Sequence, residues 1–200
     1  MFLVLGAGII LFYERGDEIL YFSSLHTPFF NQFFILITKL AEAPLFVFIA
    51  LVALTTGLGR GMVLILTFLV NGVITQFLKI VVFTAEQRPV FFFKDKAELN
   101  IVPGIEQLSD HSFPSGHTST AFAVMFMLSM FTKDKRWSYA YFTMALLVAV
   151  SRVYLMQHFF RDVYFGSLLG VVVAAFIFWF FVESKFYHSL SWRNKKLVRN

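Results

Sequence analysis

The run 162-DVYFGSLLGVVVAAFIFWFFVE-183 decides the fold class, because it is apolar between the acidic residues at its two ends and is long enough for a membrane-spanning helix. The composition of the whole chain is also that of a membrane protein. Of its 200 residues, 58% are hydrophobic and 19% are aromatic, a balance far from that of a soluble domain. Because an open sheet edge would leave unpaired backbone groups in lipid, the sequence predicts an all-α, polytopic helical bundle.

Six apolar runs are predicted to span the membrane within a single domain, residues 1–200. The first rises only ~18 Å as a helix, against a hydrocarbon core of ~30 Å, so either it is partial or its start lies upstream. Thr27 is expected to cap an interfacial helix that opens at Pro28; alternatively, this helix merges with the next span across Ala43 and Pro44. The predicted spans are 2–13, 45–59, 62–84, 115–132, 138–157 and 162–183.

Charge sets the predicted orientation in the membrane. Basic residues without matching acids gather in three places, which share one side if six helices alternate. The positive-inside rule makes that side cytoplasmic, so both termini lie there and the opposite helix ends meet the outer face of a bacterial-type inner membrane. The three places are Arg60, the KDKR loop at 133–136, and the tail with Lys185, Arg193, Lys195, Lys196 and Arg199.

The composition also excludes several kinds of chemistry. The chain has no cysteine, which excludes a disulfide framework, a thiolate nucleophile and a cysteine-based metal site. Its net charge is +5, and in a membrane protein such charge indicates orientation rather than a nucleic-acid partner.

Directly upstream of the last span, residues 151–162 read SRVYLMQHFFRD and place ionisable side chains in apolar surroundings. Such residues are costly near membrane depth and mark a functional site. His158 and Asp162 are four residues apart, so on a continuous helix Asp162 can accept from one ring nitrogen and leave the other free to attack. Arg161 is expected to be solvated or to face lipid headgroups.

The outer helix ends are expected to form an anion pocket. Cations with many donors suit a phosphate, and the amides at a helix N-terminus favour an anion. His117, on another helix, can protonate a departing oxygen. The pocket is predicted to contain Lys79, Arg88, Arg152, Ser115 and Gly116.

Taken singly, these residues have simpler interpretations. Lys79 can extend from its helix end to the interface, and Arg88 can pair with Glu86. Ser115 can be only a helix cap. The combination on one face is what favours a functional site.

That combination resembles the three-part signature of the type 2 phosphatidic acid phosphatase family, which includes bacterial undecaprenyl diphosphate, phosphatidylglycerophosphate and lipid A phosphatases. The second and third parts are PSGH at 114–117 and SR, H and D within 151–162, and both match throughout. In the first part, residues 80–87 separate Lys79 from Arg88, which is eight residues where the family usually has six.

The resemblance implies a metal-independent phosphatase without a cofactor. It implies that His158 forms a phosphohistidine, that Asp162 orients it, and that His117 protonates the leaving group. The remaining matched residues would bind the phosphoryl oxygens. The implied site residues are therefore His158, His117 and Asp162 for catalysis and Lys79, Arg88, Ser115, Gly116 and Arg152 for phosphate binding.

We therefore expect a membrane lipid phosphatase whose substrate is a phosphorylated lipid, with undecaprenyl diphosphate or phosphatidylglycerophosphate favoured. A lipid A phosphatase, a lipid phosphotransferase and a non-catalytic lipid-binding or transport protein are the alternatives. The loop 85–113 is expected to be an interface anchor or a lid over the site. The pair Gly166 and Gly170 predicts close helix packing, and the oligomeric state is not predicted.

Overall fold

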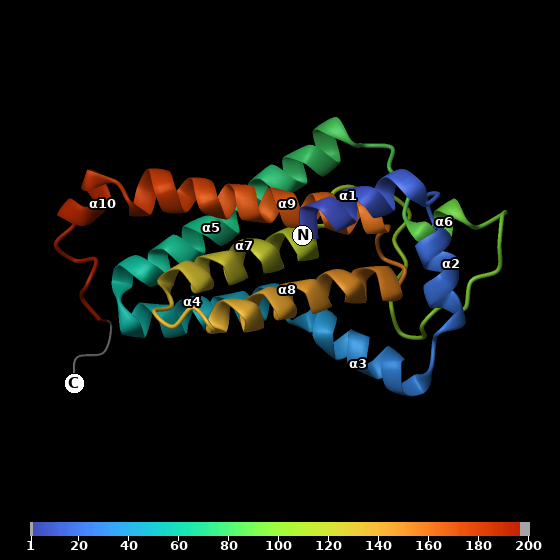
Figure 1. Ribbon diagram of the computed structural model, residues 1–200, viewed down its shortest axis with the longest axis horizontal. Coiled ribbons are helices and arrows are strands. Elements are labelled where there is room, and N and C mark those ends of the chain that lie inside the picture. Colours follow the sequence, from blue (N-terminus) through green and yellow to red (C-terminus); the bar gives the residue numbers. More distant parts are fainter. Residues whose placement is uncertain (1, 197–200) are drawn as a thin grey trace.

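The computed structural model describes residues 2–196, so Arg199 of the predicted basic tail lies outside the described residues. The chain forms an elongated helical bundle (Figure 1). The helices are α1 (Phe2–Phe12), α2 (Asp17–Ser24), α3 (Pro28–Lys39), α4 (Ala43–Thr56), α5 (Leu58–Phe77), η1 (Leu78–Val82), α6 (Pro89–Phe92), α7 (Gly116–Phe131), α8 (Trp137–Tyr154), α9 (Phe160–Ile177), η2 (Phe178–Val182) and α10 (Lys185–Ser189).

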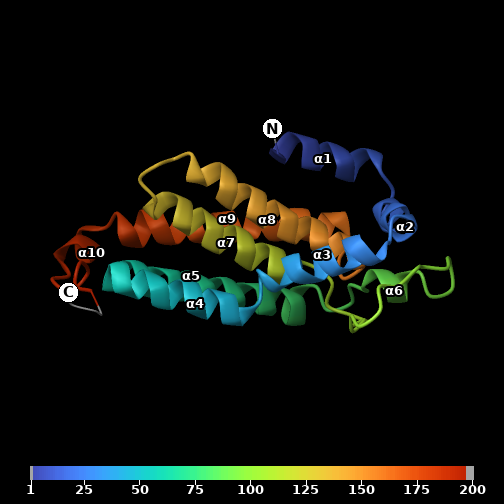
Figure 2. The same ribbon diagram turned by 90° about the horizontal axis from the view of Figure 1, so that it is seen from below.

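The bundle is built around α7, which packs against α9, α8 and α5. In Figure 2, α4 and α5 form one side of the bundle and α8 lies on the other, with α7 and α9 between them. The core contains Ala121, Ala123 and Met127 from α7, and each is inaccessible to solvent. The all-α prediction is therefore confirmed for the part of the chain that the structure describes.

Fewer helices than the six predicted are long and apolar enough, by length and composition, to cross a membrane in the described part of the chain. Leu58–Val82 and Phe160–Val182 are long and apolar enough to cross a membrane. The α3–α4 pair, bent by 48°, adds a third if it is one span. Each predicted run coincides with a helix within a few residues, but among the residues described the count of six spans stays a prediction.

At the α3–α4 junction the chain forms two separate helices, and the interfacial position of α3 stays a prediction. Thr27 caps α3, since its side chain accepts a hydrogen bond from the backbone N–H of Phe30, and Pro28 takes the first helical position. The helix ends at Lys39, and α4 begins at Ala43 with Pro44 in its first turn, so the two helices do not merge. This bend turns the end of α3 towards α8 and the candidate site.

Close contact between α7 and α9 confirms the packing predicted from the glycine pair. A Cβ atom on Gly166 would lie 2.7 Å from the backbone oxygen of Ser115, and one on Gly170 would collide with the backbone oxygen of Ser119. The two helices thus approach without intervening side chains. The start of α7 is held directly against the first half of α9, which also places Ser115 beside Asp162.

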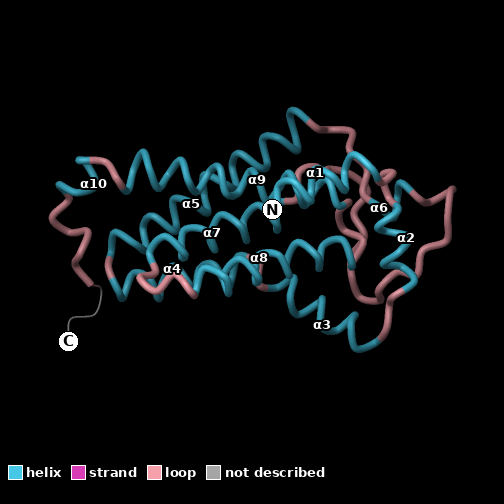
Figure 3. Tube along the Cα trace, viewed as in Figure 1, coloured by secondary structure: helices cyan, strands magenta, loops and turns pink. Residues whose placement is uncertain are grey.

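The two ends of the bundle differ in character. Figure 3 shows most of the loop between α6 and α7 at the end where α2 and α6 also lie. The α4–α5 turn, the α7–α8 loop and α10 lie at the opposite end (Figure 1). There the tail returns to the bundle, because the N–H groups of Leu58 and Gly59 donate to the backbone oxygens of Lys195 and Arg193. The basic places and the candidate site therefore occupy opposite ends.

Candidate active site

A cavity of about 610 Å³ opens between α4, α5 and α7 at the loop-rich end of the bundle. The site residues predicted from sequence divide into those that line it and those behind it. Ser115 and Asp162 are fully buried behind the wall. The other six line the cavity, namely Lys79, Arg88, Gly116, His117, Arg152 and His158.

The segment carrying His158 is not a continuous helix, so the geometry expected for the His–Asp pair is corrected. Helix α8 ends at Tyr154, and α9 begins only at Phe160, because Met156 takes a left-handed conformation with φ of 55°. Asp162 lies in the first turn of α9, where its Oδ2 accepts from the N–H of Phe159 at 3.0 Å. The carboxylate is thus fixed by the helix start rather than by a helix shared with His158.

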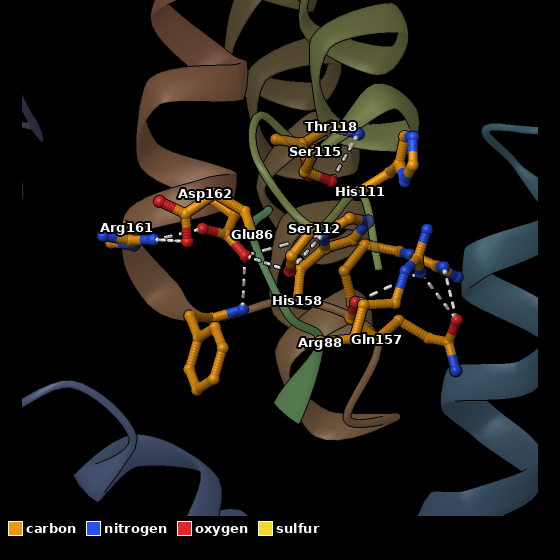
Figure 4. Close-up of polar contacts among 12 residues, drawn as sticks. Glu86, Arg88, His111, Ser112, Ser115, Thr118, Gln157, His158, Arg161 and Asp162 are labelled. Carbon is orange, nitrogen blue, oxygen red and sulfur yellow. Dashed lines mark hydrogen bonds and ion pairs between the residues drawn. The ribbon is translucent and has the colours of Figure 1, made fainter. Parts of the chain in front are cut away.

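Asp162 still faces His158, with Nδ1 of the ring 3.7 Å from Oδ2 of the carboxylate. This separation is longer than the hydrogen bond that the sequence predicted. Ser112 lies beside both groups: its hydroxyl donates to Asp162 Oδ2 at 2.5 Å and is 3.5 Å from His158 Nδ1 (Figure 4). The three side chains form one buried polar cluster.

His158 is 1% exposed and lies outside the spanning helices. Burial, followed by the positive charges of Lys79, Arg88 and Arg152, lowers the pKa of His158 well below its ordinary value. The lowered pKa favours the neutral form of the imidazole. With Nδ1 directed at Ser112 and Asp162, Nε2 is the nitrogen left for a ligand in the cavity.

The cavity arginines are held by neutral acceptors. Arg88 donates through Nε to the backbone oxygen of Asp110 at 3.1 Å and through Nη1 to the side chain of Gln157 at 3.1 Å. Arg152 donates through Nη1 to the hydroxyl of Thr38 at 2.7 Å. Its Nε is buried and has no acceptor among the described residues, which leaves a donor for a ligand.

Lys79 is likewise held by a neutral acceptor. Its ammonium donates to the backbone oxygen of His111 at 2.9 Å, and it lies in the π-helical turn η1 that follows α5. The side chain is buried at the cavity wall, so it does not extend to the interface as the simpler alternative proposed. A π turn is a common feature of functional sites, and this one lies in the segment where the first motif is longer than usual.

Two predicted site residues, Ser115 and Gly116, lie at the start of α7, and only Gly116 lines the cavity. Ser115 caps the helix, because its hydroxyl accepts from the N–H of Thr118, and its own N–H donates to the backbone oxygen of Asp162 at 3.0 Å. That amide is therefore engaged inside the protein. Gly116 lines the cavity beside His117, so a ligand there meets the backbone of the first turn of α7.

A second set of charges lies on the other side of the His158–Asp162 segment, and it argues against the simpler interpretation of Arg88. Glu86 accepts from Arg161 and from Arg15, the latter at 3.2 Å, rather than from Arg88. Arg161 is thus paired, although 31% of its side chain is exposed, and its Nε lies 3.4 Å from Asp162 Oδ1. Whether it faces lipid headgroups stays a prediction. We call Arg15, Glu86 and Arg161 the rear cluster. Figure 4 shows Glu86 and Arg161 on the side away from Arg88 and Gln157.

Several site residues carry no sequence signal. Ser112, Gln157 and Thr38 belong to no part of the signature, and Thr38 lies 114 positions from the arginine that it binds. Only the folded chain brings them to the site. In the described part of the chain, no group of three or more His, Cys, Asp or Glu residues is placed to hold a metal ion.

The fold and site together define a class: an all-helical protein with apolar spanning helices, whose cavity holds cations and two histidines. Comparison with known families is consistent with this description. The family model described as "PAP2 superfamily" matches residues 60–186, and the chain belongs to that family. The resemblance inferred from the signature is thereby confirmed.

Curated relatives share parts of the chain. A Bacillus licheniformis "Bacitracin transport permease protein BcrC" is 36% identical over 91 residues, which are 46% of this chain and 44% of that protein. "Lipid phosphate phosphatase 1" of Arabidopsis thaliana is 34% identical over 154 residues, covering 64% of this chain and 46% of the relative. The chain thus spans less than half the length of these relatives.

Two solved structures have a similar fold. The crystal structure of Aquifex aeolicus LpxE has a TM-score of 0.71 at 24% identity, covering 82% of this chain and 94% of that one. The Bacillus subtilis transmembrane PAP2-type phosphatidylglycerolphosphate phosphatase has a TM-score of 0.67 at 24% identity, covering 92% and 94%. The fold is therefore shared over most of the described chain.

Proposed function

We propose that this chain is a membrane phosphatase that removes a phosphate from a phosphorylated lipid through a phosphohistidine on His158. One observation carries the proposal: His158 and His117 share a cavity with Lys79, Arg88 and Arg152. Cations alone would serve to hold an anionic headgroup, whereas two histidines add a nucleophile and an acid. This favours an enzyme over a binding or transport protein.

In the first step, Nε2 of His158 attacks the phosphorus, and an N–P bond forms as the P–O bond to the leaving group breaks. His117 donates its proton to the departing oxygen. The ring of His158 becomes positively charged, and Asp162, 3.7 Å from Nδ1, stabilises that charge. The neutral ring and the adjacent carboxylate are the two features that this step needs.

In the second step, a water molecule attacks the phosphohistidine while His117 accepts its proton. The N–P bond breaks, inorganic phosphate leaves, and His158 returns to its neutral form. Throughout, the three cavity cations offset the negative charge that develops on the phosphoryl oxygens. Gly116 lets the phosphoryl group approach the first turn of α7. Ser115 supports this turn as its cap, and no step needs a metal.

The proposed substrate class rests on the position of the cavity and on the relatives. The cavity lies between apolar helices, and its wall includes the aromatic ring of Phe68, so a lipid presents its phosphate there with its chain in apolar surroundings. Relatives are named as lipid phosphate phosphatases and as a lipid A 1-phosphatase. We favour undecaprenyl diphosphate or phosphatidylglycerophosphate, with lipid A next.

The membrane arrangement is part of the same proposal. We propose six spans in one domain, residues 1–200, with the cavity at the outer face of an inner membrane and both termini cytoplasmic. The basic turn, loop and tail at the end of the bundle opposite the cavity support this orientation. No nucleic-acid partner is proposed.

The test is phosphate release in detergent micelles containing EDTA, from phosphatidic acid, phosphatidylglycerophosphate, undecaprenyl diphosphate and lipid A. Wild type is expected to release phosphate, His158→Ala to release none above background, and the exposed far-end control His188→Ala to match wild type. An alkaline quench followed by mass spectrometry should locate phosphate on His158.

Two results would overturn the proposal. Activity retained by His158→Ala would show a different nucleophile. No release from any lipid by folded wild type would indicate a binding protein, unless phosphate moves to an added acceptor lipid, which would indicate a phosphotransferase.

A further inference from the structure

Gln157 lies directly before His158 and belongs to no part of the signature, yet it is 4% exposed and lines the cavity. Its side-chain oxygen accepts from Nη1 of Arg88 at 3.1 Å and lies 3.4 Å from Nη2 of Arg152. Its backbone oxygen accepts from Arg88 as well, at 3.2 Å. One residue therefore holds two arginines that come from different parts of the chain.

The two guanidinium groups repel each other, because each carries a full positive charge and both reach the same oxygen atom. A carboxylate in this place would hold them more strongly but would also neutralise them. The amide is an uncharged acceptor, so it fixes both groups while their charge remains available to an anion. This explains why a glutamine suits the position.

The nitrogen end of the amide fixes its orientation. Nε2 of Gln157 donates to the backbone oxygen of Glu106 at 3.1 Å and to the side-chain oxygen of Gln107 at 2.9 Å. The arginine donors face the oxygen of the amide, and the two acceptor oxygens face its nitrogen. Only one of the two flipped orientations of the amide therefore satisfies every partner. The loop around Glu106, which lines the cavity, is thus joined to both arginines through this one side chain (Figure 4 shows Gln157 beside Arg88).

We propose that Gln157 is a positioning residue that sets the separation and direction of Arg88 and Arg152 for the phosphoryl group. The inference rests on the proposed function, in which these arginines bind the phosphoryl oxygens. Arg152 has a buried Nε without an acceptor in the described structure, so the pair is held with a donor unused. A phosphoryl oxygen supplies the missing acceptor.

The main test is Gln157→Met, which keeps the size of the side chain and removes the acceptor. Losing hydrogen bonds to charged groups should raise KM for the lipid phosphate, and the Kd for inorganic vanadate, about tenfold, with a smaller fall in kcat. Gln157→Glu should keep the arginines in place but neutralise them, so vanadate should bind at least as weakly as in Gln157→Met and with a weaker dependence on salt. Vanadate binding is measured by its effect on Tm, which does not require turnover.

The matched control is Gln87→Met, since Gln87 is an exposed glutamine next to Arg88. It should keep wild-type KM and vanadate affinity. Gln107→Leu provides a second variant that leaves both arginine contacts unchanged and removes only one anchor of the amide. It should shift KM in the same direction by about two- to threefold.

A folded Gln157→Met protein with wild-type KM and vanadate affinity overturns the inference. If Gln157→Met does not fold, Gln107→Leu decides: an unchanged vanadate Kd overturns the inference, and the expected rise supports it. Failure of the proposed function looks different, because wild type would then release no phosphate from any lipid while vanadate binding could still be compared among the variants.

Discussion

The cavity arginines and the rear cluster lie on two sides of the same short segment, and they differ in what accepts their hydrogen bonds. Arg88 and Arg152 bind an amide, a hydroxyl and backbone oxygens. Arg15 and Arg161 share the carboxylate of Glu86. Among the described residues, no carboxylate accepts a hydrogen bond from the first pair, whereas the second pair is bound to a carboxylate of the protein.

This difference shows that the hydrogen-bond partner of an arginine near an active site indicates its role better than its position in the sequence does. Arg161 adjoins Asp162 in sequence, yet it belongs to the rear cluster. Arg88 and Arg152 are far apart in sequence, yet they share one amide. Neither cavity arginine donates a hydrogen bond to a carboxylate in the described structure, although Glu42 lines the same cavity, whereas both rear arginines pair with Glu86. This difference is why we propose an anionic ligand for the cavity pair and a structural role for the rear pair.

The largest effect should come from removing a cavity arginine. Arg152→Ala should lower kcat/KM by about 10²–10³-fold, because one donor to the developing phosphoryl charge is lost. Arg152→Lys should recover only part of this loss, since it restores the charge without the planar fork. Phosphate release from the best lipid of the proposed assay measures both variants, and kcat/KM within threefold of wild type for Arg152→Ala would contradict the distinction.

A smaller effect is expected from the rear cluster. Arg161→Gln removes the ion pair with Glu86, and a partly exposed pair contributes only about 0–1 kcal/mol, so Tm should fall by no more than about 4 °C. The fall in kcat should be about tenfold at most, because Asp162 keeps its bonds to Ser112 and Phe159. Glu86→Gln and the double variant complete a cycle, and additive changes in Tm would show that the pair is not coupled.

Variants of the cavity cations and of the rear cluster should also differ in the pH dependence of kcat/KM. Because the pKa of His158 is lowered, the acid limb of kcat/KM should lie below the ordinary value of 6.5. Lys79→Met removes one of the charges that lower this pKa, so it should move the acid limb upward, whereas Arg161→Gln should not. If the acid limb of Lys79→Met stays at the wild-type pH, the limb does not report the protonation of His158.

The same shift predicts the sign of a stability change. The folded-state pKa of His158 lies below its unfolded value, so the unfolded chain binds more protons between the two values. The free energy of unfolding should therefore be lost progressively as pH falls below about 6.5. Thermal unfolding of wild type and His158→Ala between pH 7.5 and about 5 measures this contribution, which should be absent in the variant.

No effect is expected at the far end of the bundle. Arg136 pairs with Asp134 two residues away, and the two side chains are 89% and 43% exposed. Arg136→Ser should leave kcat/KM and Tm at wild-type values, because exposed pairs contribute little. This variant serves as the reference against which the cavity and rear changes are measured, and a loss of activity would show that the two ends are coupled.

Much of the helical plan is readable from sequence because apolar length and capping residues mark it locally. The six apolar runs coincide with helices, and Thr27 and Pro28 mark the start of α3. Short helices such as α2 and α10 lack a long apolar run, and their contacts with the rest of the fold stabilise them. The break between α8 and α9 depends on the backbone conformation of Met156, for which the sequence has no visible signal.

The signature residues are readable for a related reason, since each part of the signature occupies a short stretch of the chain, even where that stretch crosses the break between α8 and α9. Partners that arrive from distant segments are not. Glu86 meets Arg161 across 75 positions, and a local pairing between Glu86 and Arg88 is the simpler expectation from sequence alone. Gln157 carries a type of side chain that is common on surfaces, so only its neighbours in the folded chain reveal what it holds.

Asp162 has one more consequence beyond its place beside His158. Its side chain fixes the segment that carries His158, and its backbone oxygen accepts from Ser115, the cap of the helix that carries His117. Both histidines are therefore attached to one residue of α9. If the bundle tilts to match a thinner or thicker bilayer, His158 and His117, which we propose as nucleophile and acid, would move together with Asp162, and the gap between the two rings would be preserved.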